Sequence, residues 1–207
     1  MGIELLTVKN DKERRFKDIV TMLEILDKNT LVSHQLVLKS SLALMLYNVV
    51  EGTMSNLLME LFDVIIRKNK SINTLPNKLQ NLFFEYHLKK IGKDTDKFKK
   101  ICCYDERELC NITYLEISKY LNLFSGNLDA RSIHNVSEKL GISLPKSEME
   151  PCLVKIKNIR NALAHGEKEF SKACQDMTLD EMKKICDKVK VYLDSLISAY
   201  ERFFDSL

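Results

Sequence analysis

Residues 30–67 read TLVSHQLVLKSSLALMLYNVVEGTMSNLLMELFDVIIR, and this stretch contains the longest helical pattern in the chain. Apolar side chains recur in it every three or four residues, at Leu36, Leu42, Leu46, Val49, Val50, Leu57, Leu58, Leu61 and Ile65. This spacing places them on one face of an α-helix, so we expect one long helix with a buried stripe. Gly52 costs about 1 kcal/mol relative to alanine inside a helix, which predicts a kink or close packing at that point.

Helical patterns continue on both sides of this stretch. We expect further helices at 11–27, at 76–92, at 129–141, at 151–165 and from residue 178 onward. Their ends carry recognisable signals, namely Asp129 as an N-cap, Pro151 at a first helical position, the capping box from Thr178 to Glu181, and the stops Gly92, Gly141 and Gly166. With only six Gly and three Pro in 207 residues, the fold class should be all-α. We therefore predict one helical-bundle domain over 1–207 with an irregular insertion at about 92–150.

Composition limits the possible partners and cofactors. The formal net charge of +3 allows a local contact with nucleic acid but does not by itself predict one. The cysteines are Cys102, Cys103, Cys110, Cys152, Cys174 and Cys186, and neither they nor the four scattered histidines show the spacing of a metal site. We expect no cofactor, no metal and no membrane span. With no secretory leader recognisable, we expect a cytoplasmic protein whose thiols are reduced and mostly buried.

The chemically most informative segment is Arg160-Asn161-Ala162-Leu163-Ala164-His165. It supplies a permanent cation and a titratable base five positions apart, near the end of a predicted helix. Asn161 and His165 are four residues apart and should share a face, and the helix dipole favours a protonated imidazole at that end. A metal-free ribonuclease needs such a pair. The plainer interpretation is a histidine that caps a helix and an arginine that forms an ordinary surface ion pair.

Other residues are weaker candidates. Lys157 and Lys168 flank the motif and could hold phosphates, although isolated surface lysines need no such explanation. Glu51 lies in an apolar-rich helix, where a carboxylate needs a partner, and Arg160 is a natural one. Alternatively, Glu51 faces solvent at a helix bend. Asn48 belongs to the same segment and is a further supporting candidate.

The chain resembles the HEPN superfamily (higher eukaryotes and prokaryotes nucleotide-binding). The hallmark of its ribonucleases, Arg-x4-His with a polar residue after the arginine, is matched by Arg160, Asn161 and His165. Three segments, 46–51, 124–131 and 161–170, resemble the stand-alone prokaryotic toxin-like branch. The resemblance implies a helical bundle that dimerises and unites two motifs in one cleft. It also implies metal-independent endoribonuclease activity in toxin–antitoxin or antiviral systems, with RNA and a possible antitoxin or defence protein as partners.

One departure from that branch concerns control of the activity. HEPN toxins silenced by nucleotidylation carry a tyrosine two residues after the histidine, where this chain has Glu167. We therefore expect another form of control and list Glu167 among the supporting residues.

The motif predicts a mechanism, and two alternatives to it stay open. His165 would take the proton from a 2′-hydroxyl or protonate the leaving oxygen, Arg160 would stabilise the phosphate, and Asn161 would orient His165 or contact the phosphate. The products would be a 2′,3′-cyclic phosphate and a 5′-hydroxyl. The alternatives are a catalytically silent adaptor that binds RNA or a protein, and a regulator that binds a nucleotide without cutting.

Overall fold

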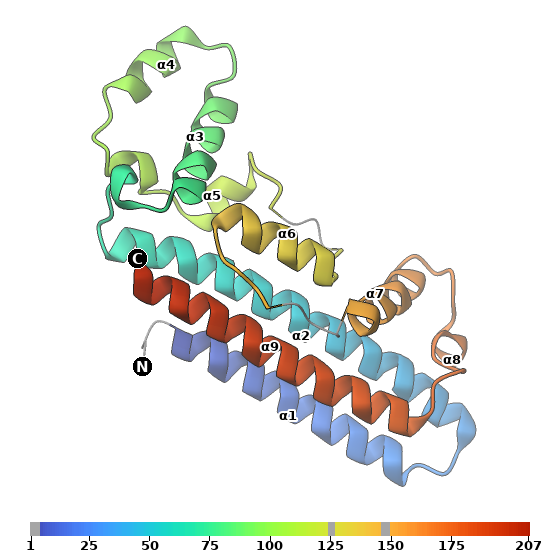
Figure 1. Cartoon of the computed structure of the whole chain (residues 1–207). Coiled ribbons are helices and arrows are strands. Elements are labelled where there is room, and N and C mark those ends of the chain that lie inside the picture. Colours follow the sequence, from blue (N-terminus) through green and yellow to red (C-terminus); the bar gives the residue numbers. More distant parts are fainter. Residues whose placement is uncertain (1–4, 124–126, 146–149) are drawn as a thin grey trace.

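The computed structural model describes residues 5–123, 127–145 and 150–207, and within these ranges the regular elements are all helical. Three long helices, α1 (Leu6–Lys28), α2 (Val32–Arg67) and α9 (Leu179–Ser206), lie side by side as an elongated bundle (Figure 1). The shorter helices pack along one side of α2 and beyond its end. The prediction of an all-α fold is confirmed.

Helix α2 is the centre of the core. It runs unbroken for 36 residues and buries a stripe that includes Leu42, Leu46, Leu57 and Leu61. Gly52 marks close packing, because a Cβ added there would lie 3.3 Å from the guanidinium carbon of Arg15 on α1. Of the two predictions for this glycine, the structure thus shows the close approach.

Helix α1 begins at Leu6, earlier than predicted, because its first turn contributes to the core. Leu5 and Val8 are almost fully buried there. Lys12 is also buried, and its ammonium group forms an ion pair with Asp194 of α9. A buried lysine is tolerated only when it is paired, so this contact fixes α1 against α9.

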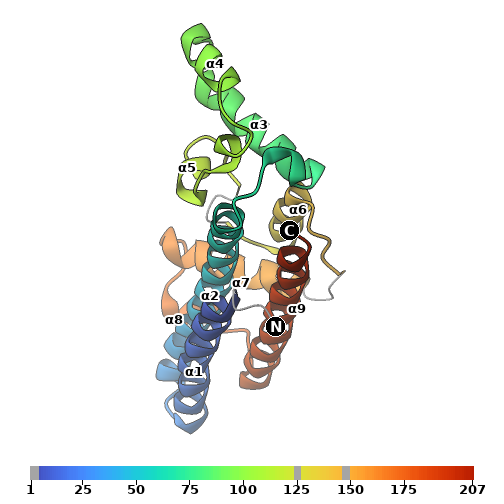
Figure 2. The same ribbon diagram turned by 90° about the vertical axis from the view of Figure 1, so that its left-hand side faces the viewer.

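The predicted irregular insertion contains short helices. After the 3₁₀ turn Ile72–Thr74, α3 (Asn77–Ile91) ends at Gly92, whose φ of 59° lies in the left-handed region. α4 (Thr95–Cys102), the 3₁₀ turn Glu108–Cys110 and α5 (Tyr114–Ser118) follow. Figure 2 shows α4 and the outer end of α3 projecting beyond the bundle.

The helix ends predicted at Asp129, Gly141 and Thr178 are confirmed. In α6 (Ala130–Leu140), the Asp129 carboxylate accepts the N–H of Ser132, and Gly141 ends the helix with a φ of 88°. Next comes α7 (Glu150–Ala164), which begins one residue before Pro151, the predicted first helical position. Both halves of the capping box at Thr178 are present at the start of α9.

One helix was not expected from the sequence, and the end of the predicted insertion, residues 146–149, lies outside the described part of the chain. The one-turn helix α8 (Phe170–Ala173) was not predicted, because four residues are too few to show a period. It packs against α2, where the Ser40 hydroxyl donates to the carbonyl oxygen of Phe170 (2.6 Å).

All six cysteines are free thiols. Cys110, Cys174 and Cys186 are buried and Cys152 is partly buried, as predicted. Burial raises the pKa of Cys110 to about 11 and that of Cys186 to about 12. Cys102 and Cys103 are exposed instead, because α4 buries none of its side chains.

Two further observations concern metals and membranes. In the part of the chain that the structure describes, no group of three or more His, Cys, Asp or Glu side chains could hold a metal ion. Among the described helices, none combines the length and the apolar character that crossing a membrane would need.

Candidate active site at the end of helix α7

The histidine of the Arg-x4-His motif caps α7. The His165 N–H donates to the Asn161 carbonyl (2.9 Å), so the backbone is still helical up to this residue. Gly166 then adopts a φ of 69°, and its N–H donates to the Leu163 carbonyl (3.2 Å). The Glu167 N–H reaches the Ala162 carbonyl (2.8 Å), which completes a Schellman motif. His165 is therefore an exposed residue at a sharply defined helix end.

Arg160 is held by contacts from two helices. One terminal nitrogen donates to the side-chain oxygen of Asn161 (2.8 Å) and the other donates to the Tyr47 hydroxyl (3.0 Å). The guanidinium carbon lies 4.3 Å from the centre of the Tyr47 ring, within the range of a cation–π contact. A carboxylate oxygen of Glu51 lies 3.9 Å from the Arg160 nitrogen that donates to Tyr47. The Arg160 side chain is 22% exposed, so it still reaches the surface.

The pairing of Glu51 with Arg160 agrees with the interpretation that this carboxylate has a partner. At 3.9 Å the pair is long, and the Glu51 side chain is 30% exposed. A surface ion pair of this kind contributes at most about 1 kcal/mol. Its main effect is to add negative charge beside the guanidinium.

Tyr47 is a site residue that the sequence interpretation missed. It lies on the buried face of α2, and only 2% of it is exposed. Its hydroxyl accepts hydrogen bonds from Arg160 and from the backbone N–H of Leu128 (3.2 Å). Burial raises the pKa of Tyr47, and the hydrogen bonds from Leu128 and Arg160 only partly oppose this, so the phenol is neutral at physiological pH. A tyrosine within the apolar stripe of a helix was the available signal, because its buried hydroxyl needs a partner.

Asp129 and Lys157 form a second link at this site, between α7 and the start of α6. The Lys157 ammonium lies 2.6 Å from the Asp129 carboxylate, and their side chains are only 21% and 15% exposed. Burial raises the pKa of Asp129, but the hydrogen bonds from Lys157 and Ser132 outweigh it and hold the value at about 2. The Lys157 ammonium group, which the sequence predicted to contact a phosphate, is thus already paired with a carboxylate. This ion pair joins α7 to the start of α6.

The three segments that carry the family resemblance meet at this site. Tyr47 comes from 46–51, Leu128 and Asp129 come from 124–131, and Asn161 begins 161–170. Residues 124–126 of the middle segment lie outside the described part of the chain. Figure 2 shows α7 crossing α2, which brings these segments together.

The remaining candidates lie around this centre without a direct link to it. Asn48, Glu167 and Lys168 are exposed, and in the described residues no hydrogen bond or ion pair joins their side chains to Arg160.

The arrangement of Arg160 and His165 suits phosphoryl-transfer chemistry. A guanidinium is fixed by a buried phenol and an amide, and an imidazole stands exposed at the end of the same helix. A fixed guanidinium can stabilise the charge that develops on a phosphate, and an accessible imidazole can transfer a proton.

Comparison with known proteins agrees with this arrangement. A family model, MAE_28990-like HEPN, matches residues 5–206 of the chain. No curated protein matches, and no solved structure matches. With nearly the whole chain covered by the family model and the hallmark residues clustered on α7, the protein belongs to the HEPN superfamily.

Proposed function

We propose that this protein is a metal-independent endoribonuclease of a toxin–antitoxin or antiviral defence system, acting in the cytoplasm. The observation that carries the proposal is the fixed guanidinium of Arg160 on the same helix as the exposed His165. Membership of the HEPN superfamily, which includes many ribonucleases, supports it. Its assignment to the stand-alone toxin-like branch is part of the proposal.

The reaction uses the 2′-hydroxyl of RNA as an internal nucleophile. A base removes the 2′-hydroxyl proton, the 2′-oxygen forms a bond to phosphorus, and the bond from phosphorus to the 5′-oxygen breaks. An acid returns a proton to that leaving oxygen. The products are a 2′,3′-cyclic phosphate and a 5′-hydroxyl. DNA lacks the nucleophile and is not a substrate.

Arg160 stabilises the negative charge of the phosphorane-like transition state. Its orientation comes from Tyr47 and Asn161, which accept from its two terminal nitrogens. Preorganised charge is effective because the protein need not rearrange as the reaction proceeds. In this structure Asn161 orients Arg160, which adds a third role to the two expected from the sequence. Glu51 is a positioning residue, and its carboxylate lies 3.9 Å from the same terminal nitrogen of Arg160 that donates to Tyr47.

Cleavage needs both a base and an acid, and one motif has a single histidine. We assign the two roles to His165 of two subunits in a homodimer. The end of α7 can be approached in this way, because Ala164, His165 and Gly166 are exposed and Ala162 is partly exposed. Small side chains there permit close contact between two helices, and a two-fold axis places both motifs in one cleft. An antitoxin or defence protein would control this dimer.

A second candidate is a non-catalytic HEPN dimer that regulates by binding RNA or a nucleotide. The same contacts favour it, because Arg160 already donates to Tyr47 and Asn161 within the subunit. In such a protein Arg160 would stabilise the fold and hold a phosphate without any reaction.

The test is incubation of the purified protein with total RNA and with a short unstructured RNA, followed by mapping of the new 5′ ends. The His165→Ala protein is the control for contaminating nuclease. Cleavage that leaves 5′-hydroxyl ends and requires His165 supports the endoribonuclease. Binding without cleavage by the wild-type dimer would instead assign the regulatory role.

A further inference from the structure

A projecting part of the chain, residues 88–104, has an unusual charge. It comprises the outer end of α3, α4 and the following turn, and we call it the arm (Figures 1 and 2). It contains six lysines and two aspartates, a net charge of +4, whereas the whole chain carries +3. The other residues therefore sum to −1, and the positive charge of this protein is concentrated in the arm.

Core packing does not account for the side chains of the arm. Ile91 is its one buried residue and Ile101 is partly buried, while the others are exposed. The exposed set includes Leu88 (63%), Phe98 (52%) and Tyr104 (46%). Large apolar side chains left in solvent on a projection are an indication of a binding surface.

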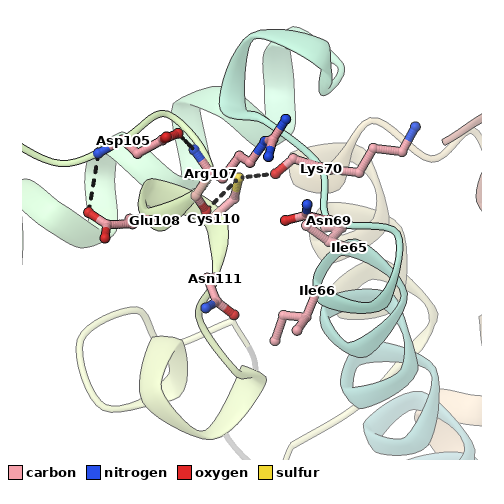
Figure 3. A pocket seen from close by; sticks show the side chains of 9 residues that line it. All are labelled: Ile65, Ile66, Asn69, Lys70, Asp105, Arg107, Glu108, Cys110 and Asn111. Carbon is pink, nitrogen blue, oxygen red and sulfur yellow. Dashed lines mark hydrogen bonds between the residues drawn. The ribbon is translucent and has the colours of Figure 1, made fainter.

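The base of the arm is firmly attached to the bundle. In Figure 3 the Cys110 thiol donates to the carbonyl oxygen of Lys70 (3.0 Å), which ties the chain after the arm to the end of α2. The Nε2–H of His87 donates to the carbonyl oxygen of Leu109 (2.9 Å), and Tyr86 packs edge-on against Tyr120. The residues on both sides of the arm are therefore fixed by contacts with the rest of the protein.

Two lysines of the arm have contacts on α3: Lys89 pairs with Glu85 (3.0 Å), and Lys90 donates to the Tyr86 hydroxyl (3.1 Å). The other four are available to an external anion. The ion pairs Lys97–Asp94 (3.4 Å) and Lys99–Asp96 (4.0 Å) join largely exposed side chains, and such pairs are weak. Within the described residues, no carboxylate pairs with Lys93 or Lys100. A polyanion can replace the weak internal pairs and gains from the release of its own counterions.

We propose that the arm binds single-stranded RNA, with the lysines on phosphates and with Phe98 and Tyr104 stacked on bases. Exposed aromatic side chains between cations are the arrangement that single-strand binders use. A protein partner is a poorer match, because lysine is depleted from the centres of protein interfaces. The choice of RNA as the polyanion rests on the proposed function.

The arm is remote from Arg160 in the same subunit. It follows the end of α2, and Arg67 lies 20 residues beyond Tyr47, which is about 30 Å at 1.5 Å per residue. A very short RNA bound at α7 cannot also reach it. The arm thus acts on longer substrates, which it captures for the site.

The experiment measures binding of a fluorescently labelled, unstructured 20-nucleotide RNA to the His165→Ala protein at several salt concentrations. In that background a triple variant, Lys97→Gln with Lys99→Gln and Lys100→Gln, should bind at least about fivefold more weakly. Its salt slope should fall by about 2, since each phosphate contact of a single strand contributes about 0.7. Phe98→Ala should weaken binding by about fivefold or more, and Phe98→Trp should restore it.

A matched control neutralises three lysines on α1 and α9, Lys17, Lys28 and Lys188, which are also exposed. It should change the affinity by less than about twofold. Equal effects of the two triple variants, or no binding by the parent, would overturn the arm as an RNA site. An altered oligomeric state of the arm variant in light scattering would overturn it in favour of a protein contact. Because binding is scored without cleavage, an inactive wild-type enzyme would contradict the proposed function and leave this result intact.

Discussion

The guanidinium carbon of Arg160 lies 4.3 Å from the centre of the Tyr47 ring, while the same side chain donates to the Tyr47 hydroxyl at 3.0 Å. These two residues are 113 positions apart in the chain. Their contact couples the hallmark arginine to α2, the helix at the centre of the core, and it makes the orientation of Arg160 depend on the packing of α7 against α2.

Replacing either hallmark residue should slow RNA cleavage at least about 10²-fold without unfolding the protein. For His165→Ala we expect a loss of about 10²–10⁴-fold, because a proton-transfer group is removed. For Arg160→Lys we expect a loss of about 10²-fold, because the charge is kept but the planar fork that binds phosphate is not. Rates on a short RNA, with circular dichroism for folding, measure both. A folded variant that still cuts at the wild-type rate would contradict the proposed site.

Removing the Tyr47 hydroxyl should impair the positioning of Arg160 without weakening substrate binding. Tyr47→Phe keeps the ring under Arg160 but leaves the buried N–H of Leu128 without its acceptor, at a cost in stability of about 1–3 kcal/mol. We expect kcat to fall about tenfold with KM little changed, because Arg160 is less well oriented. Tyr200→Phe is the control, since it breaks a buried bond to Ser137 that involves neither Arg160 nor Tyr47, and it should leave kcat unaltered.

The link between Asp129 and Lys157 predicts a defined acid sensitivity. The folded-state pKa of Asp129 is about 2, below its value in the unfolded chain, so the stabilisation is present above about pH 4 and is lost as the pH falls toward 2. The loss amounts to about 2 kcal/mol. Asp129→Asn keeps the N-cap but not the ion pair, so urea unfolding of the variant should lack this part of the pH dependence. Parallel curves for the two proteins between pH 5 and pH 2 would argue against the assignment.

Cleavage should persist in EDTA. The proposed proton transfers use His165 and the phosphate charge is met by Arg160, so no bound metal ion enters the reaction. The assay needs a short unstructured RNA, because magnesium also changes RNA folding. If EDTA stops cleavage and a divalent ion restores it, the mechanism is metal-assisted instead.

Mixed dimers test whether the site is composite. Wild-type and His165→Ala subunits carrying different affinity tags can be co-expressed and their heterodimers isolated. We expect activity far below half that of the wild-type dimer, because either the base or the acid is missing from the shared cleft. Half the wild-type activity, or an active monomer in light scattering, would show that each motif works alone.

Much of the fold follows from local sequence signals. The long helix 32–67, the cap at Asp129, the box at Thr178 and the stops at Gly141 and Gly166 depend on the hydrogen bonds and backbone angles of neighbouring residues. The Arg-x4-His motif and its position at a helix end are likewise recognisable from neighbouring residues. Such features are determined over a few residues, so periodicity and cap chemistry were sufficient to predict them.

The tertiary structure alone decided which side chains surround Arg160 and where the charge is displayed. Tyr47, Leu128 and Arg160 meet because α7 crosses α2, and no local period records which buried hydroxyl will face which guanidinium. Lys157 could be a phosphate ligand in the sequence, but packing places it against Asp129. The lysines of 88–104 were visible as a charged run, yet only the projection of α3 and α4 from the bundle exposes them together. Long-range contacts select these arrangements, because they depend on how helices pack and not on how each helix forms.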